Sequence, residues 1–262
     1  MLHVIGLTKR YGRLTALSDV SFSINPGEVL GLIGPNGSGK TTLFECLGGV
    51  LAPDDGSLQR GDRRLTPDER VATLFYLPDN IAPWPAQTVR WALAFVAGYF
   101  GTSTGGYFGR TPTPESVSGV QSQSTEPESG AGVADVIRQF ELEPLLESPI
   151  GTLSKGQRKR VLLAIGLLTP QPVLLADEPF DGLDLRQTRE VAQTLRSYAA
   201  SGRTIFLSIH QITDAARVCD RFVLLSGGQT RGEGTLDELA ALAAHRNAAA
   251  GTNLEEIFLA LT

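Results

Sequence analysis

The segment GPNGSGKT, Gly34 to Thr41, constrains the fold of this chain more than any other. It fits the pattern G-x-x-x-x-G-K-[ST], follows the apolar run VLGLI, and leads into KTTLFECLGGVL, which has helical character. Strand, glycine-rich loop and helix in this order begin a crossover unit of a parallel sheet. Three later apolar runs, PVLLAD, TIFLSI and RFVLLS, are separated by helical stretches. The sequence therefore predicts a doubly wound α/β core around a buried, mainly parallel sheet.

The residue types in this loop indicate phosphate binding. Glycines let backbone N–H groups converge on phosphates, and the helix that follows adds the positive end of its dipole. Lys40 is placed to reach β- and γ-phosphates, and the Thr41 hydroxyl is placed to ligate Mg²⁺. A turn that only caps a helix does not require Lys and Thr at these positions. We therefore expect these residues to bind nucleotide: Gly34, Pro35, Asn36, Gly37, Ser38, Gly39, Lys40, Thr41 and Thr42.

Two carboxylates end the apolar strand in VLLADEP, residues 173 to 179. Asp177 is placed at the strand tip to hold Mg²⁺ through water, and Glu178 points the other way, where it can polarise an attacking water. Acidic turns are common at strand ends. Together with the phosphate loop, the pair predicts hydrolysis of a nucleoside triphosphate.

Length and composition bound the alternatives. A chain of 262 residues with 42% hydrophobic content can build one core with an inserted subdomain, but is short for two enzymatic domains. A net charge of −5 argues against nucleic acid as the main partner. The N-terminus lacks the apolar region of a signal peptide, and the apolar stretch WALAFVAGYF is shorter than the roughly 20 residues that span a bilayer. Any action on a membrane is therefore expected to require a partner.

Between Phe100 and Val133 the composition changes to Gly, Ser, Thr, Pro, Gln and Glu. A segment of this kind cannot bury enough apolar surface to offset its chain entropy. We expect a disordered insertion at residues 101–132, inside a helical subdomain at about residues 88–169. Cys46 and Cys219 lack the paired spacing of metal sites or disulfide frameworks and are expected to be reduced thiols.

Six motifs follow one another in a recognisable order: GPNGSGKT, YLPDN, LSKGQ, LLADEP, DGLD and SIHQ. In type and order they resemble the nucleotide-binding domain of ATP-binding cassette (ABC) transporters, and the resemblance covers nearly the whole chain outside the insertion. It implies a P-loop NTPase core with a mainly parallel sheet, an N-terminal antiparallel β subdomain and an inserted helical subdomain. It also implies hydrolysis of ATP with Mg²⁺.

The resemblance assigns roles to further residues. It implies that Tyr11 stacks on adenine and that His210 contacts the γ-phosphate and acts with Glu178 in catalysis. A surface tyrosine in a β-turn and a structural histidine are the alternatives. Asp79, in YLPDN, stands where the family most often has Gln, and it is expected to take a Mg²⁺-linked role with Thr41 and Asp177 or to be a solvated turn residue.

Two segments compete for the signature that grips the second ATP of a dimer. LSKGQ precedes RKRVLLAIGLLTP, a helical stretch, so its amides are expected at a helix N-terminus. LSGGQ ends the run RFVLL and precedes TRGEGTL, which predicts a hairpin with Gly227 and Gly228 at positive φ. We therefore assign the signature to Ser154, Gly156 and Gln157, and expect the LSGGQ hairpin on the far side of the sheet. Lys155 and, in DGLD, Asp181 depart from the family's usual Gly and Ser.

The resemblance further implies a peripheral subunit at the cytoplasmic face of a membrane. Two copies, or one copy and a homologue, would sandwich ATP and drive a separate transmembrane permease. The segment GTNLEEIFLALT is similar to tails of exporter subunits, while the cargo is not encoded in this chain. A soluble cassette ATPase acting on ribosomes or DNA is the alternative, although such proteins usually carry two cassettes or a long coiled-coil insertion. The presence of Glu178 and His210 argues against a regulatory module that binds nucleotide without hydrolysing it. A GTPase is excluded because the sequence has no Asn-Lys-x-Asp segment, which reads guanine.

Overall fold

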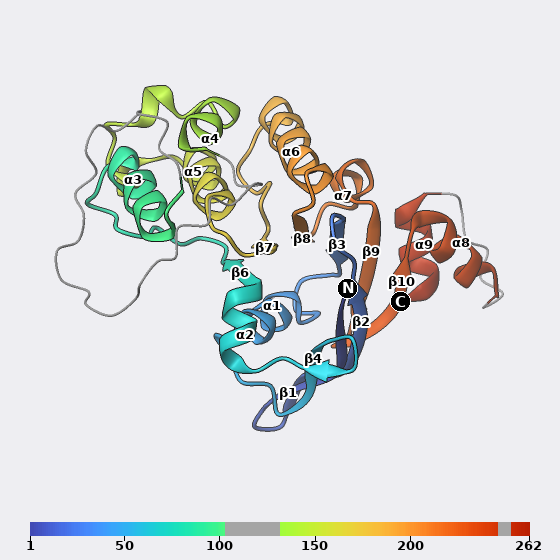
Figure 1. Ribbon diagram of the computed structural model, residues 1–262. Helices are drawn as coiled ribbons and strands as arrows, with labels where there is room; N and C mark the ends of the chain where they lie inside the picture. The colour runs from blue at the N-terminus through green and yellow to red at the C-terminus, as the bar shows by residue number, and fades with distance from the viewer. Residues whose placement is uncertain (103–131, 246–252) are drawn as a thin grey trace. The chain divides into compact units, whose positions relative to one another are not determined.

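The computed structural model describes residues 1–102, 132–245 and 253–262 (Figure 1). Two compact units share these residues. The first contains Met1–Asp79, Gln171–Pro179 and Leu195–Thr262, and the second contains Asn80–Pro170 and Phe180–Thr194. Within the described residues, no helix has both the length and the apolar character needed to cross a membrane.

The first unit contains two sheets. The antiparallel sheet has the order β2-β1-β4-β5, built from β1 (Leu2–Tyr11), β2 (Leu14–Ile24), β4 (Asp55–Arg60) and β5 (Arg63–Arg64). The second has the order β10-β9-β3-β8-β7-β6, built from β3 (Val29–Ile33), β6 (Leu74–Leu77), β7 (Val173–Asp177), β8 (Thr204–Ile209), β9 (Arg221–Ser226) and β10 (Gln229–Gly234). Neighbouring strands from β9 through β3, β8 and β7 to β6 pair in parallel, and β10 pairs antiparallel with β9 at one edge. Both predicted sheets are therefore present.

Continuous apolar runs explain the central strands. Every residue of β3, β7 and β8 is buried, as expected for parallel strands covered on both faces. Helix α1 (Lys40–Gly48) contributes Phe44, whose ring lies 4.8 Å from that of Phe206 on β8. Phe22 of the antiparallel sheet lies 5.5 Å from the same Phe206 ring. One core thus joins both sheets and helix α1.

The remaining helices of the first unit are α2 (Pro67–Thr73), α7 (Ile212–Val218), α8 (Leu236–His245) and α9 (Leu254–Leu261). The second unit contains α3 (Val89–Phe100), α4 (Val133–Gln139), the short 3₁₀ turns Glu143–Leu145 and Ile150–Thr152, and α5 (Lys155–Leu167). Helix α6 (Leu185–Ala200) begins in the second unit and ends in the first. The helical subdomain expected at about residues 88–169 lies inside the second unit.

The predicted insertion at residues 101–132 lies outside the described residues except for its ends. Gly101 ends α3 with φ of +70°, and Gly132 is the N-cap residue of α4. The Thr102 hydroxyl donates a hydrogen bond of 3.1 Å to the Leu168 carbonyl. These three residues therefore belong to the helical framework.

Replacing residues 103–131 with a linker of about eight Gly and Ser residues is expected to preserve folding and ATPase activity. The polar composition of this segment offers little apolar surface to bury, and loop-closure entropy changes slowly with length. Thermal unfolding and steady-state ATP turnover of the deletion variant check this. A melting midpoint lower by many degrees would show that the segment packs on the core.

Candidate functional site

The glycine-rich loop between β3 and α1 has a backbone path that few residue types can follow. Gly37 and Gly39 have φ of +80° and +104°. A Cβ atom on Gly39 would lie 2.7 Å from the Ala16 carbonyl oxygen, and one on Gly34 would lie 2.3 Å from that of Leu225. The glycines are therefore required by conformation and by close backbone approach.

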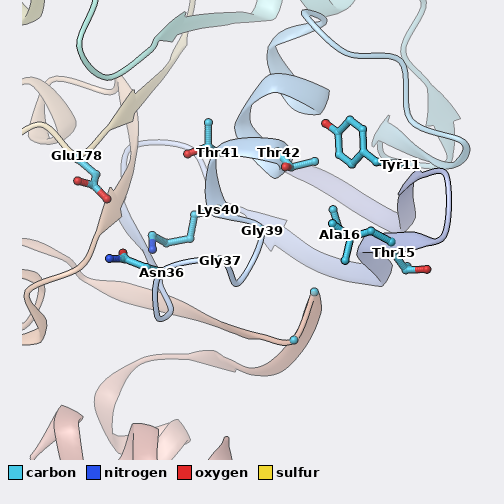
Figure 2. Close-up of a pocket in the computed structure, with 13 residues that line it drawn as sticks. Tyr11, Thr15, Ala16, Asn36, Gly37, Gly39, Lys40, Thr41, Thr42 and Glu178 are labelled. Atoms are coloured by element: carbon cyan, nitrogen blue, oxygen red, sulfur yellow. The ribbon is translucent and has the colours of Figure 1, made fainter.

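A cavity of about 610 Å³ opens on the first unit beside this loop (Figure 2). Many residues expected to bind nucleotide line it, namely Tyr11, Asn36, Gly37, Gly39, Lys40, Thr41 and Thr42, together with Glu178. Gly34, Pro35 and Ser38 belong to the same loop without lining the cavity. The lining also includes five residues that the sequence analysis did not assign: Leu14, Thr15, Ala16, Gly227 and Gly228.

Lys40 supplies the cation of the site. Its side chain is buried, and its Nζ donates hydrogen bonds to the carbonyl oxygens of Gly34, at 2.8 Å, and Pro35, at 3.3 Å. Burial lowers the pKa of Lys40, and the negative charges of Glu178 and Asp177 oppose this shift. Figure 2 shows Lys40 and Glu178 together at one side of the cavity and Tyr11 at the other. This places a positive charge where phosphates of a bound nucleotide would lie if its base contacted Tyr11.

Asp177 is held by hydroxyl groups on both of its oxygens. Thr41 Oγ1 donates to Asp177 Oδ2 at 2.9 Å, and Ser208 Oγ donates to Oδ1. A hydroxyl and a carboxylate oxygen in contact are hard ligands of the kind Mg²⁺ prefers, so Thr41 and Asp177 fit a magnesium site. Asp79 follows β6, the parallel neighbour of β7, so it lies at the same sheet edge, where it is half-buried and outside the cavity lining. Its metal-linked role stays a prediction.

Glu178 has an unusual backbone conformation that separates it from Asp177. Its φ is +47°, a region that costs a non-glycine residue about 1–3 kcal/mol. The Glu178 amide donates to Ser208 Oγ at 3.0 Å and to the Ser208 carbonyl at 3.2 Å, which stabilises this turn. Glu178 therefore lines the cavity while Asp177 stays buried. His210 Nδ1 lies 3.5 Å from Glu178 Oε2, so the predicted catalytic pair is adjacent.

Tyr11 ends β1 with an accessible aromatic ring. The residue is 46% exposed, and Lys9 Nζ lies 5.7 Å from the ring centroid. A flat ring at the rim of a cavity can stack on a planar base. The attraction between the Lys9 ammonium group and the ring helps to hold the ring in place. The ring is accessible, and its contact to adenine stays a prediction.

Ser154 begins helix α5 in the second unit. Its Oγ accepts a hydrogen bond from the Gln157 amide at 3.3 Å, while Gln157 Oε1 accepts one from the Ser154 amide at 2.9 Å. This reciprocal capping box sets the first turn of the helix. A Cβ atom on Gly156 would lie 2.5 Å from the Gly182 carbonyl oxygen, which explains the glycine. The predicted helix N-terminus is confirmed, with Ser154 exposed.

Comparisons with known proteins agree with this geometry. The profile of the family described as ABC transporter matches residues 17–181. This chain belongs to the ABC transporter family. It is 33% identical to the Nod factor export ATP-binding protein I of Ralstonia nicotianae, over 91% of this chain and 68% of that protein. It is 28% identical to the ABC-type transporter ATP-binding protein EcsA of Bacillus subtilis, over 100% of this chain and 96% of that protein.

A solved structure described as the ATP-binding subunit of an ABC transporter superposes with a TM-score of 0.79. Its sequence is 29% identical to this chain, and the superposition covers 100% of this chain and 99% of that structure. The ADP conformation of the ABC cassette MJ1267 gives a TM-score of 0.70 at 25% identity, covering 90% of this chain and 91% of the cassette. The chain is thus an ATP-binding subunit of the ABC family, an ATPase with the predicted P-loop NTPase fold.

The LSGGQ segment of this ABC subunit is a hairpin, as predicted, but its expected location is wrong. Gly227 and Gly228 have φ of +57° and +73° and form the turn between β9 and β10. Both line the nucleotide cavity and do not lie on the far side of the sheet. The reason is strand order: β9 pairs in parallel with β3, with Leu224 opposite Ile33. Segments that follow two adjacent parallel strands emerge at the same sheet edge.

Lys155 and Asp181, the two residues that differ from the family's usual Gly and Ser, contact each other within the second unit. Lys155 forms an ion pair with Asp181, and both side chains are partly exposed. The Lys155 side chain also covers Gly182, where a Cβ atom would lie 2.9 Å from Lys155 Cγ. A cation in the signature is therefore matched by a carboxylate in the DGLD segment. Exposed ion pairs of this kind contribute roughly 0–1 kcal/mol, so complementarity of charge is the main consequence.

Proposed function

We propose that this ABC ATPase powers a separate membrane permease by ATP-driven closure of a dimer. ATP would be held between the phosphate loop of one copy and Ser154 of a second copy or a homologue. The observation that carries this proposal is the exposed, capped N-terminus of α5 in a chain whose nucleotide cavity is open to solvent. A helix N-terminus with a serine hydroxyl suits the γ-phosphate of an ATP bound by another chain.

The site residues divide the chemistry between them. Lys40 is proposed to exchange its loop carbonyl partners for β- and γ-phosphate oxygens. Thr41 and Asp177 would hold Mg²⁺, which neutralises developing charge on the phosphates. Glu178 would accept a proton from the attacking water, and His210, at 3.5 Å, would orient the Glu178 carboxylate.

Export is the direction we propose. Several relatives that are 32–33% identical to this chain are named Nod factor export ATP-binding proteins. The C-terminal segment, in which Leu254–Leu261 forms α9, is the part of the sequence that resembles exporter tails.

An exposed aromatic stripe on the second unit supports a protein partner. Trp91, Phe95 and Tyr99 follow one another at helical spacing on α3, with ring centroids 5.0 and 6.5 Å apart, and Trp84 packs on Phe95 at 5.3 Å. Phe95 is 40% and Tyr99 73% exposed. Contiguous exposed aromatic rings mark interaction surfaces, where aromatic residues are enriched. We assign this stripe to the permease.

The double substitution Phe95→Ala with Tyr99→Ala is expected to lower permease-stimulated ATP turnover at least about tenfold, as hot-spot aromatic rings do in interfaces. Turnover without permease should stay unchanged, because the stripe lies outside the nucleotide cavity. The test reconstitutes the subunit in vesicles with the multispanning protein that co-purifies with it. Val71→Ala, at a 60% exposed apolar position on α2, is the control. If the permease stimulated the double variant as strongly as the wild type, the aromatic stripe would not be part of the interface. If the permease did not stimulate the wild-type subunit, the proposed partnership would be contradicted.

A further inference from the structure

We infer that Gly228, at the tip of the hairpin that follows β9, positions the phosphate loop of its own chain for binding ATP and ADP. The inference rests on the proposed site residues and extends them to a segment without an assigned role. It concerns nucleotide binding by one copy, so it is independent of permease and dimer.

The tip connects the phosphate loop to the antiparallel sheet. The Gly228 amide donates to the Ser38 carbonyl at 3.2 Å, and the Gly228 carbonyl accepts from the Ser18 amide at 2.8 Å. Gly228 therefore bridges the loop and β2 through backbone groups alone. Ser38 lies between Gly37 and Gly39, and Ser18 lies two residues after Ala16, and all three of these neighbours line the cavity.

A second contact supports the same loop from the preceding strand. A Cβ atom on Gly34 would lie 2.3 Å from the carbonyl oxygen of Leu225, near the end of β9. The first residue of the phosphate loop thus packs directly on the strand that leads into the tip. Because the loop is held at Gly34 and at Ser38, a shift of the tip displaces the backbone amides that face the phosphates.

The two tip glycines differ in what surrounds them. A Cβ atom on Gly228 would lie 2.6 Å from the Ala16 carbonyl oxygen and 3.0 Å from its carbon, which are backbone atoms that cannot move aside independently. A Cβ atom on Gly227 would meet only the end of the Arg231 side chain, at 3.6 Å. Both glycines have positive φ. Alanine at either position therefore carries a similar conformational cost of about 1 kcal/mol, but only alanine at 228 forces the tip away from β2.

Gly61, which is not part of the cavity lining, provides a matched control for Gly228. Gly228→Ala is expected to weaken binding of ATP and of ADP at least about tenfold, measured by isothermal titration calorimetry on the full chain without permease. Gly61→Ala, at a glycine with φ of +59° in the turn between β4 and β5 where an added Cβ atom would meet nothing within 4 Å, should change either affinity less than about threefold. The melting midpoints separate this effect from the shared conformational cost. Equal affinities in the two variants would overturn the inference. If the wild-type chain bound no ATP, the site assignment itself would fail, which is a different outcome.

Hydrogen exchange on the wild-type chain keeps the inference testable even if Gly228→Ala does not fold. Saturating ATP is expected to slow amide exchange in a peptide containing Leu225–Gln229 together with the peptide containing the phosphate loop. Slowing in the phosphate loop with unchanged exchange in the hairpin peptide would show that the tip takes no part in nucleotide binding.

Discussion

Lys40→Met is expected to reduce ATP turnover at least about a hundredfold, because catalysis of phosphoryl transfer depends on positive charge at the β- and γ-phosphates. Methionine keeps the unbranched apolar part of the side chain and removes the ammonium group that contacts the Gly34 and Pro35 carbonyls. Turnover is measured with saturating Mg²⁺ and ATP. Wild-type turnover in Lys40→Met would contradict the assignment of the phosphate loop.

Stability separates this effect from unfolding. Burial disfavours the charged form of Lys40 and lowers its pKa, which opposes the stabilisation from its hydrogen bonds to the Gly34 and Pro35 carbonyls. The melting midpoint of Lys40→Met is therefore expected to stay close to that of the wild type when nucleotide is absent. Added ATP should raise the wild-type midpoint and leave that of the variant nearly unchanged, because a ligand stabilises only the state that binds it.

Local signals in the sequence were sufficient where the structure depends on neighbouring residues. The apolar run before Gly34 predicted β3, and the Lys and Thr that follow the glycines predicted a functional loop at the start of α1. Serine and glutamine three residues apart, at 154 and 157, form the capping box that starts α5. Glycines 227 and 228 predicted a tight turn, and a tight turn is present.

The errors and omissions have one physical cause, which is pairing between segments far apart in the chain. Turn chemistry at Gly227 does not reveal that β9 lies beside β3, and this strand order brings the hairpin to the nucleotide cavity. Thr15 and Ala16 were missed because the antiparallel sheet folds against the phosphate loop through backbone contacts that no motif encodes. The ion pair of Lys155 with Asp181 joins two departures that look unrelated in sequence.

Glu178→Gln is expected to slow hydrolysis at least about a hundredfold while ATP stays bound, because the amide cannot accept the proton of the attacking water. Glutamine keeps the length of the side chain and the backbone hydrogen bonds to Ser208. If ATP closes two copies on each other, the unhydrolysed nucleotide should hold them together. Size-exclusion chromatography with light scattering should then show monomer without ATP and dimer with ATP.

The serine of the signature can be tested without disturbing its helix. Ser154→Asp keeps an N-cap side chain that accepts the Gln157 amide, since Asp and Ser cap helices about equally well. It adds a negative charge where the account places the γ-phosphate of the ATP bound by the other copy. Ser201→Asp adds the same negative charge at an exposed position after α6, with loss of the hydrogen bond that Ser201 Oγ donates to the Tyr198 carbonyl, and serves as the control for charge.

The decisive measurement is the molar mass of these double variants with saturating ATP and Mg²⁺, in the background of Glu178→Gln. The account predicts that Ser154→Asp with Glu178→Gln stays monomeric, because like charges of aspartate and phosphate oppose closure, while Ser201→Asp with Glu178→Gln dimerises fully. ATP binding to the monomer should be equal in both. An ATP-dependent dimer in the Ser154→Asp variant that is as complete as in the control would contradict the proposal that Ser154 grips the nucleotide of a second copy.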